Sequence, residues 1–124
     1  MTRDEVNAMT DEELRGWAWT IAYTERPYKN LVSDKGHANI DNATILVPDY
    51  PNDIAAAWEL IEHNPDYRWA VYELDGGGWA ATLMKVVGTR GEHCLWDHVS
   101  EATEDTAARA ITRAFILAMT EEGD

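Results

Sequence analysis

Two runs rich in β-forming residues, joined by a glycine-rich turn, constrain the fold of this chain more than any other feature. The runs are RWAVYEL and GWAATLMKVV, and Asp75 and three glycines connect them. Aspartate and glycine supply the positive φ angles that a tight connection needs. The segment therefore predicts an antiparallel hairpin. EHCLWDHV is expected to add a third strand after a turn at residues 88–91, which places the sheet within residues 67–99.

Amphipathic patterns on both sides of the hairpin predict helices over residues 10–23, 52–63 and 105–120. Residues 26–47 combine Pro, Gly, Asn and Asp without a sustained period, so we predict a loop, with a short extended segment at TILVP. Helices that bury their stripes on such a sheet make an α+β fold. We expect one domain over residues 1–124: an antiparallel sheet of three strands, or slightly more, with helices packed on it in an α/β/α sandwich-like arrangement.

Local signals mark where the helices begin. Thr2 with Glu5, and Thr10 with Glu13, have the spacing of capping boxes, so a single turn should precede the helix that starts near residue 10. The helix over 52–63 is capped by Asn52 or Asp53. Its apolar stripe, which we expect to face the core, consists of Ile54, Ala57, Trp58 and Ile61.

The chain is strongly acidic, with 23 acidic against 10 basic residues and a net charge of −13. Direct binding to nucleic acid needs many lysines and arginines, so this balance argues against it. It fits solubility, a basic protein partner or mimicry of nucleic acid. The chain has a single cysteine, and it shows neither an apolar run that could span a bilayer nor a secretion signal. These features predict a cytoplasmic protein with no membrane association.

No known catalytic or metal-binding pattern stands out. HCLWDH brings His93, Cys94, Asp97 and His98 together, but the spacing matches no standard zinc motif. The DGGG run lacks the lysine and the following helix of a phosphate-binding loop. Neither serine of the chain lies in a nucleophile motif. We therefore expect no metal, no cofactor and no enzymatic activity.

Two arginines of the C-terminal helix pose a question for so acidic a chain. Arg109 and Arg113 are one turn apart, on the side opposite a buried stripe centred on Ile111. Asp105, with help from Glu104, can pair with Arg109. Arg113 has no acid within reach on the same helix. One interpretation is a solvated face with one local ion pair; the other is that an anionic ligand, or acids from another element or subunit, neutralises Arg113. A ligand site would predict that Arg113→Ala abolishes binding and leaves the melting temperature nearly unchanged.

Two of the six tryptophans, Trp69 and Trp79, bracket the hairpin. The sequence leaves open which face of the sheet they occupy. An exposed aromatic ring beside the arginines would suit a base and a phosphate together. The expected ligand-binding residues are thus Arg109, Arg113, Trp69 and Trp79. A homo-oligomer would bring two copies of Arg113 together.

Three segments resemble the phage ABA-sandwich domain family, small proteins of tailed phages and prophages: MTRDEVNAM, VPDYPNDIAAAWELIE (47–62) and DTAARAITRAFILAM (105–119). The matching positions are Tyr50, Asp53, Ile54, Ala56, Ala57, Trp58, Glu62, Asp105, Thr106, Ile111, Arg113 and Ala114. Pro51-Asn52 stands where the family tends to have Ser-Thr, and Thr112 where it tends to have cysteine. The resemblance implies a phage accessory protein with a helix–sheet–helix sandwich.

Three functions follow as hypotheses for such a protein in the host cytoplasm. The first is non-enzymatic anti-defence by sequestering a small anionic, nucleotide-type signal. The second is an acidic inhibitor that binds a host defence protein, or a nucleic-acid mimic. The third is a structural or assembly role in the virion.

Overall fold

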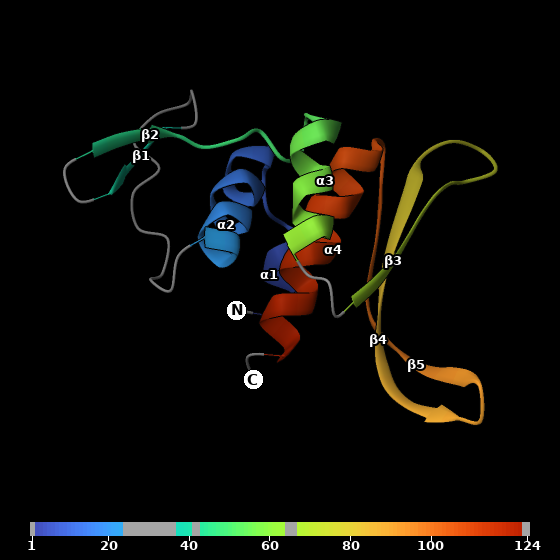
Figure 1. The fold of residues 1–124 in the computed structure, drawn as a ribbon. Helices are drawn as coiled ribbons and strands as arrows, with labels where there is room; N and C mark the ends of the chain where they lie inside the picture. Colours follow the sequence, from blue (N-terminus) through green and yellow to red (C-terminus); the bar gives the residue numbers. More distant parts are fainter. Residues whose placement is uncertain (1, 24–36, 41–42, 64–66, 123–124) are drawn as a thin grey trace.

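The computed structural model describes residues 2–23, 37–40, 43–63 and 67–122, and its helices and sheet are arranged around one central helix, α4 (Figure 1). The elements are α1 (Arg3–Asn7), α2 (Asp11–Tyr23), β1 (His37–Ile40), β2 (Ala43–Leu46), α3 (Ile54–His63), β3 (Tyr67–Glu73), β4 (Trp79–Arg90), β5 (His93–Glu104) and α4 (Ala107–Glu122). The α+β class predicted from the sequence is confirmed.

The main sheet is antiparallel with the strand order β3-β4-β5. Its first connection is the predicted turn, in which Gly76, Gly77 and Gly78 have φ angles of 109°, 100° and 95°. The Leu74 amide closes the turn by donating to the Gly78 carbonyl at 3.0 Å. The third strand is longer than predicted because β5 continues past residue 99 and pairs with the start of β4, down to Trp79 opposite Glu104.

The helix α4 packs against the inner face of this sheet. Its residues 110–118 are all buried, on every side of the helix, and Ser100 of β5 donates a hydrogen bond of 2.8 Å to the Ala114 carbonyl. The expectation of one buried and one solvated face is therefore wrong for α4. Because α1, α2 and α3 pack on the side of α4 away from the sheet, that side is covered as well.

The layers also differ from the predicted α/β/α order. All four described helices lie on one side of the three-stranded sheet (Figure 1), so the sequence of layers is sheet, then α4, then α2 and α3. On the opposite face Tyr72 is 45% exposed. The helices lie on one side of the sheet because α2 and α3 bury their apolar residues on α4 and make their main contacts there.

Both N-terminal capping boxes form. The backbone amides of Glu5 and Glu13 donate hydrogen bonds to the hydroxyls of Thr2 and Thr10. In return, the backbone amides of these threonines donate hydrogen bonds to the two glutamate carboxylates. At the start of α3, Asp53 accepts a hydrogen bond of 3.0 Å from the Ala55 amide, as predicted for one of the two candidate caps.

The predicted loop over residues 26–47 contains a small sheet. β1 and β2 pair antiparallel, with His37 opposite Leu46 and Ile40 opposite Ala43. The strands are too short for a periodic pattern to mark them, although β2 overlaps the extended segment expected at TILVP. Residues 26–36 lie outside the described part of the chain.

Candidate functional site

Arg113 is buried, and its guanidinium is surrounded by protein oxygens, although its Nε makes no hydrogen bond among the described residues. The residue is 8% exposed, and its Nε lies 2.6 Å from Oε1 of Glu104, at the end of β5. Its Nη atoms donate to the backbone carbonyls of Val6, Asn7 and Met9. The prediction that Arg113 lies on an exposed face is therefore wrong. Of the alternatives considered, an acid from another element neutralises this charge.

Arg109 is also paired, though with a partner far away in the sequence. Its Nε and Nη2 donate to the two carboxylate oxygens of Asp11, each at 2.8 Å. This fork-to-carboxylate contact is the strong form of such a pair. The hydrogen bond from Arg109 is the main reason that the pKa of Asp11 lies below its usual value, against the opposing effect of partial burial. Asp105, the predicted partner, does not form this ion pair.

The two arginines thus hold the N-terminal helices against α4. Arg113 donates hydrogen bonds to carbonyls at the end of α1 and in the turn after it. Arg109 forms an ion pair with Asp11, the first residue of α2. In both cases the guanidinium is occupied by protein atoms. An anionic ligand would have to break these contacts in order to bind here.

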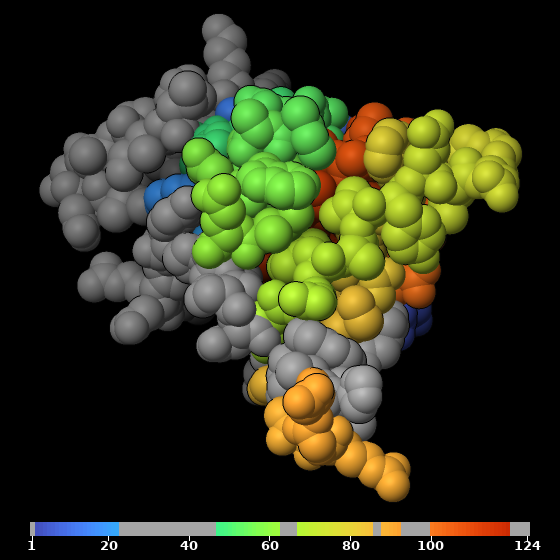
Figure 2. All heavy atoms as spheres, turned by 45° about the vertical axis from the view of Figure 1, so that its right-hand side comes forward, coloured from blue at the N-terminus to red at the C-terminus, as the bar shows by residue number. Residues whose placement is uncertain are grey.

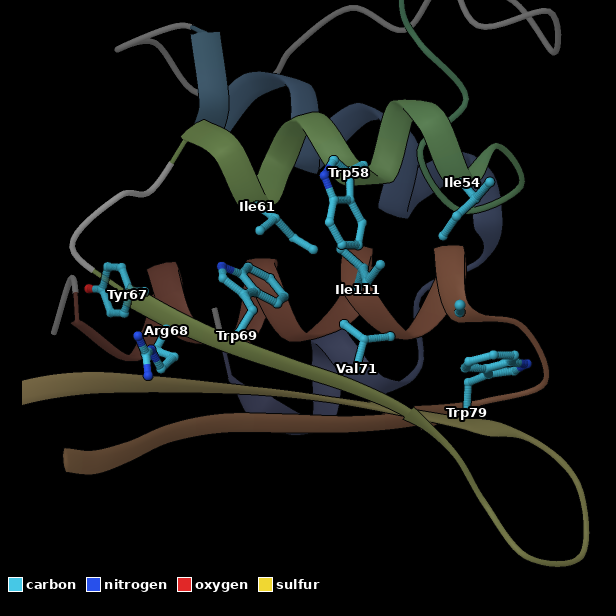
Figure 3. Close-up of a pocket in the computed structure, with 10 residues that line it drawn as sticks. Ile54, Trp58, Ile61, Tyr67, Arg68, Trp69, Val71, Trp79 and Ile111 are labelled. Carbon is cyan, nitrogen blue, oxygen red and sulfur yellow. The ribbon is translucent and has the colours of Figure 1, made fainter.

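A groove of about 590 Å³ opens elsewhere, between α3 and β3 (Figure 3). In Figure 2 the green α3 and the yellow-green β3 lie on its two sides. Its floor is formed by α4, through Ile111 and Ala107. The other lining residues are Ile54, Trp58 and Ile61 from α3, Tyr67, Arg68, Trp69 and Val71 from β3, and Trp79 from β4.

The side of α3 that faces this groove was expected to be part of the core. Ile54 and Trp58 are each 51% exposed, whereas Ala57 and Leu60 of the same helix are fully buried. The predicted core role of Ile54 and Trp58 is therefore wrong. The signal that could have revealed the groove is that α3 has more apolar residues than one stripe needs, so that a second apolar face remains after the first is buried.

Trp69 and Trp79, whose face the sequence left open, both lie on the inner side of the sheet. Each is half-buried and lines the groove, together with Trp58 from the opposite wall (Figure 3). The structure thus brings the two predicted tryptophans to one site, and the residues that line it do not include Arg109 or Arg113. The indole Nε1 of Trp69 is buried and has no hydrogen-bond acceptor among the described residues.

The charged residue in the lining of the groove is basic, and the elements around it carry exposed acids. Arg68 lines one end, where Lys85 lies 6.0 Å from the centre of the Tyr67 ring. The exposed carboxylates on the helices, strand and turns that form the groove are Asp53, Glu59, Glu62, Glu73 and Asp105. The groove therefore offers apolar burial and aromatic stacking, with Arg68 at one end, on a chain of net negative charge.

The cluster at residues 93–98 falls within β5, and the side chains of His93, Cys94, Asp97 and His98 lie outside what the structure describes. Their backbone pairs with β4 between Met84 and Arg90, with register shifts in both strands. Among the described residues, no group of three or more potential ligands could hold a metal ion. Within the same residues, no helix has the length and apolar character that crossing a bilayer requires.

Comparisons with known proteins show a likeness at the level of structure. No family model matches the chain, and no curated protein matches it. Among solved structures, a phage protein from Bacillus cereus ATCC 14579 is similar with a TM-score of 0.64 and 18% sequence identity. The alignment covers 90% of this chain and 94% of that one. At this identity the likeness establishes that the two chains share an α+β fold over nearly their whole length.

Proposed function

We propose that this chain is a non-enzymatic phage accessory protein that binds a partner protein through the groove between α3 and β3. The observation that carries the proposal is the half exposure of Ile54 and Trp58 on the wall of this groove. Large apolar side chains gathered at one concave site are typical of a binding surface, and tryptophan is the residue most enriched among those that dominate binding energy. The name of the structurally similar phage protein supports the phage origin.

The charge of the chain supports a basic partner. With a net charge of −13, the protein attracts positively charged surfaces and repels negatively charged ones. Of the functions considered from the sequence, this combination best fits an acidic inhibitor of a host defence protein, acting in the host cytoplasm.

Sequestration of a nucleotide-type signal has less support. Trp58, Trp69 and Trp79 could stack on a base, but Arg109 and Arg113 are both neutralised internally. The carboxylates around the groove would also oppose a phosphate. No described feature favours a role in virion assembly over the other two.

The test is capture of host proteins by the purified chain, with two variants compared. Ile54→Ser combined with Trp58→Ser removes both exposed apolar groups of the groove, and Tyr72→Ser removes an exposed aromatic ring from the opposite face of the sheet as a matched control. If the proposal is right, wild type and Tyr72→Ser retain a basic host protein, and the double variant does not. Raising the salt concentration should elute this protein. Equal retention by the double variant would overturn it.

A biological readout accompanies the capture. Wild type and Tyr72→Ser should restore plaque formation of a sensitive phage on a host that carries the captured defence factor, and the double variant should not. Native mass spectrometry of protein from infected cells separates the alternatives. A retained nucleotide, lost in the double variant, would favour sequestration and contradict the proposal.

A further inference from the structure

The turn between β3 and β4 contains a pair of residues that is chemically reactive in proteins. Asp75-Gly76 is the only place in the sequence where an aspartate or an asparagine precedes a glycine. Glycine has no side chain to shield its backbone nitrogen, so the carboxyl of the preceding aspartate can reach this nitrogen. Both residues are exposed, and the turn projects from the end of the sheet, away from the helices (Figure 1).

Neither of the two reacting groups is held by another part of the protein. The Leu74 amide donates a hydrogen bond to the Gly78 carbonyl, and the Gly77 amide donates one to the Leu74 carbonyl. The Gly76 amide donates no hydrogen bond within the described residues. The Asp75 carboxyl likewise has no hydrogen bond or ion pair in the described part of the chain. A Cβ added at Gly76 would meet no atom within 4 Å, so a ring has space to form here.

We propose that Asp75 is a site of spontaneous isomerisation to isoaspartate. The Gly76 nitrogen attacks Cγ of the protonated Asp75 carboxyl; the N–Cγ bond forms, a Cγ–O bond breaks, and the hydroxyl leaves with the amide proton as water. The product is a five-membered succinimide ring. Water then opens the ring at either carbonyl, so that one opening restores aspartate and the other leaves the main chain running through Cγ. The overall reaction conserves mass and uses no reactant other than water.

Isoaspartate at this position lengthens the main chain of the turn by one carbon. The two hydrogen bonds that close the turn lie within residues 74–78, so an added atom strains or breaks one of them. A Cβ at Gly78 would lie 3.2 Å from the Glu104 carbonyl oxygen, so β5 leaves little room for the turn to shift. Trp79, which lines the groove, follows directly and pairs with Glu104. Isomerisation should therefore loosen the sheet at this end of the groove.

Two other exposed aspartates provide comparisons within the chain. Asp53 accepts a backbone hydrogen bond at the start of α3 and precedes Ile54. Asp105 precedes Thr106. In both cases the following residue is β-branched, and its bulk hinders the approach of its nitrogen to the carboxyl. We therefore expect isomerisation at Asp75 and not at these two positions.

The experiment incubates the purified full chain in warm, mildly acidic buffer and then digests it with trypsin. The peptide over residues 69–85 contains Asp75 as its only aspartate. Isoaspartate appears as a second species of equal mass, separated by chromatography and identified by electron-transfer fragmentation. A synthetic peptide of residues 69–85 measures how fast the unfolded sequence reacts. Asp75→Glu is the matched control, because it keeps the charge but would have to close a six-membered ring, which forms much more slowly.

Wild type should accumulate the second species, and Asp75→Glu should not. Fragmentation of the other peptides should locate no isomer at Asp53 or Asp105. In the converted chain, hydrogen exchange of the Leu74 amide should accelerate roughly two- to tenfold, as expected for the loss of one hydrogen bond.

Three outcomes would overturn the inference. If the folded chain forms no isomer under conditions that convert the synthetic peptide, the turn protects Asp75. If Asp53 or Asp105 isomerises as fast, the turn is not a selective site. If exchange of the Leu74 amide is unchanged in the converted chain, the added carbon does not loosen the turn. The proposed function is tested separately, by capture of a host protein.

Discussion

Arg113 Nε lies 2.6 Å from Glu104 Oε1, which joins the buried face of α4 to the end of β5. The same guanidinium donates to three carbonyls around the end of α1. One side chain therefore connects the first helix, the last strand of the sheet and the central helix. This network makes Arg113 a structural residue and reverses the expectation that its replacement would leave the melting temperature unchanged.

Arg113→Ala should destabilise the protein by about 3–5 kcal/mol, because it leaves the Glu104 carboxylate without its partner and three carbonyls without a donor. Arg113→Lys keeps the charge but not the planar set of donors, so its cost should be smaller. Urea denaturation followed by circular dichroism measures both. The exposed Arg90 at the end of β4 provides the control, and Arg90→Ala should change stability by less than about 0.5 kcal/mol. A melting temperature unaltered by Arg113→Ala would contradict this role.

The pair of Asp11 and Arg109 should appear in the pH dependence of stability. The pKa of Asp11 is lowered in the folded state, so its contribution is complete above the ordinary carboxyl pKa of the unfolded chain. As the pH falls through the lowered pKa, this contribution is lost. Asp11→Asn should thus be less stable than wild type at neutral pH, by about 1 kcal/mol or less because the pair is partly exposed.

The measurement is the melting temperature of wild type and Asp11→Asn between about pH 7 and pH 2, a range that spans the titration of carboxyls. The two proteins should converge at the acid end. Glu92→Gln, at an exposed turn position, is the control and should follow wild type throughout. A constant difference down to the lowest pH would mean that the Asp11 charge is not the source of the effect.

Two positions on α3 should respond in opposite ways. Trp58→Ser should cost about 1 kcal/mol or less, because half of the residue is already exposed. Leu60→Ala, two residues away and fully buried, should cost about 2–5 kcal/mol through lost burial and a new cavity. Chemical denaturation of the two variants tests this difference. If Trp58→Ser were as destabilising as Leu60→Ala, the groove side of α3 would be part of the core.

The prediction of local structure from the sequence succeeded where short-range chemistry decides. The threonine and glutamate pairs fix the starts of α1 and α2, and the three glycines fix the β3–β4 turn, because each signal acts over a few residues. Together with the amphipathic patterns, these signals identified the helices and the hairpin, and thus the α+β class. The short strand β1 carries no comparable signal and was predicted as a loop, and β2 was anticipated only as the extended segment at TILVP.

The candidate site could not be derived in the same way, because it depends on how many elements surround each helix. Arg109 pairs with Asp11, which is 98 residues away in the sequence, and no pattern within α4 predicts this pair. The burial of Arg113 follows from α1 packing on α4, which a helical wheel does not contain. The exposure of Trp58 likewise depends on which of two apolar faces α3 turns toward α4.

Ser100 and Ala114 give a test of the contact between sheet and central helix. Ser100→Ala removes a buried hydrogen bond to the Ala114 carbonyl and should cost about 1 kcal/mol or somewhat more, since the carbonyl loses its donor. Thr103→Ala, at an exposed position of the same strand, is the control and should have a smaller effect. Equal losses in denaturation experiments would show that the hydroxyl contributes nothing at this contact.

The position of α4 has a consequence for synthesis. Every other described helix packs on α4, yet α4 follows all of them along the chain. A ribosome therefore synthesises the central helix after the elements that pack around it. Until α4 emerges from the exit tunnel, the earlier helices lack the surface on which most of their apolar residues are buried. Folding of this unit must then wait for the synthesis of α4, and a nascent chain cut short before residue 107 should be a substrate for chaperones and proteases.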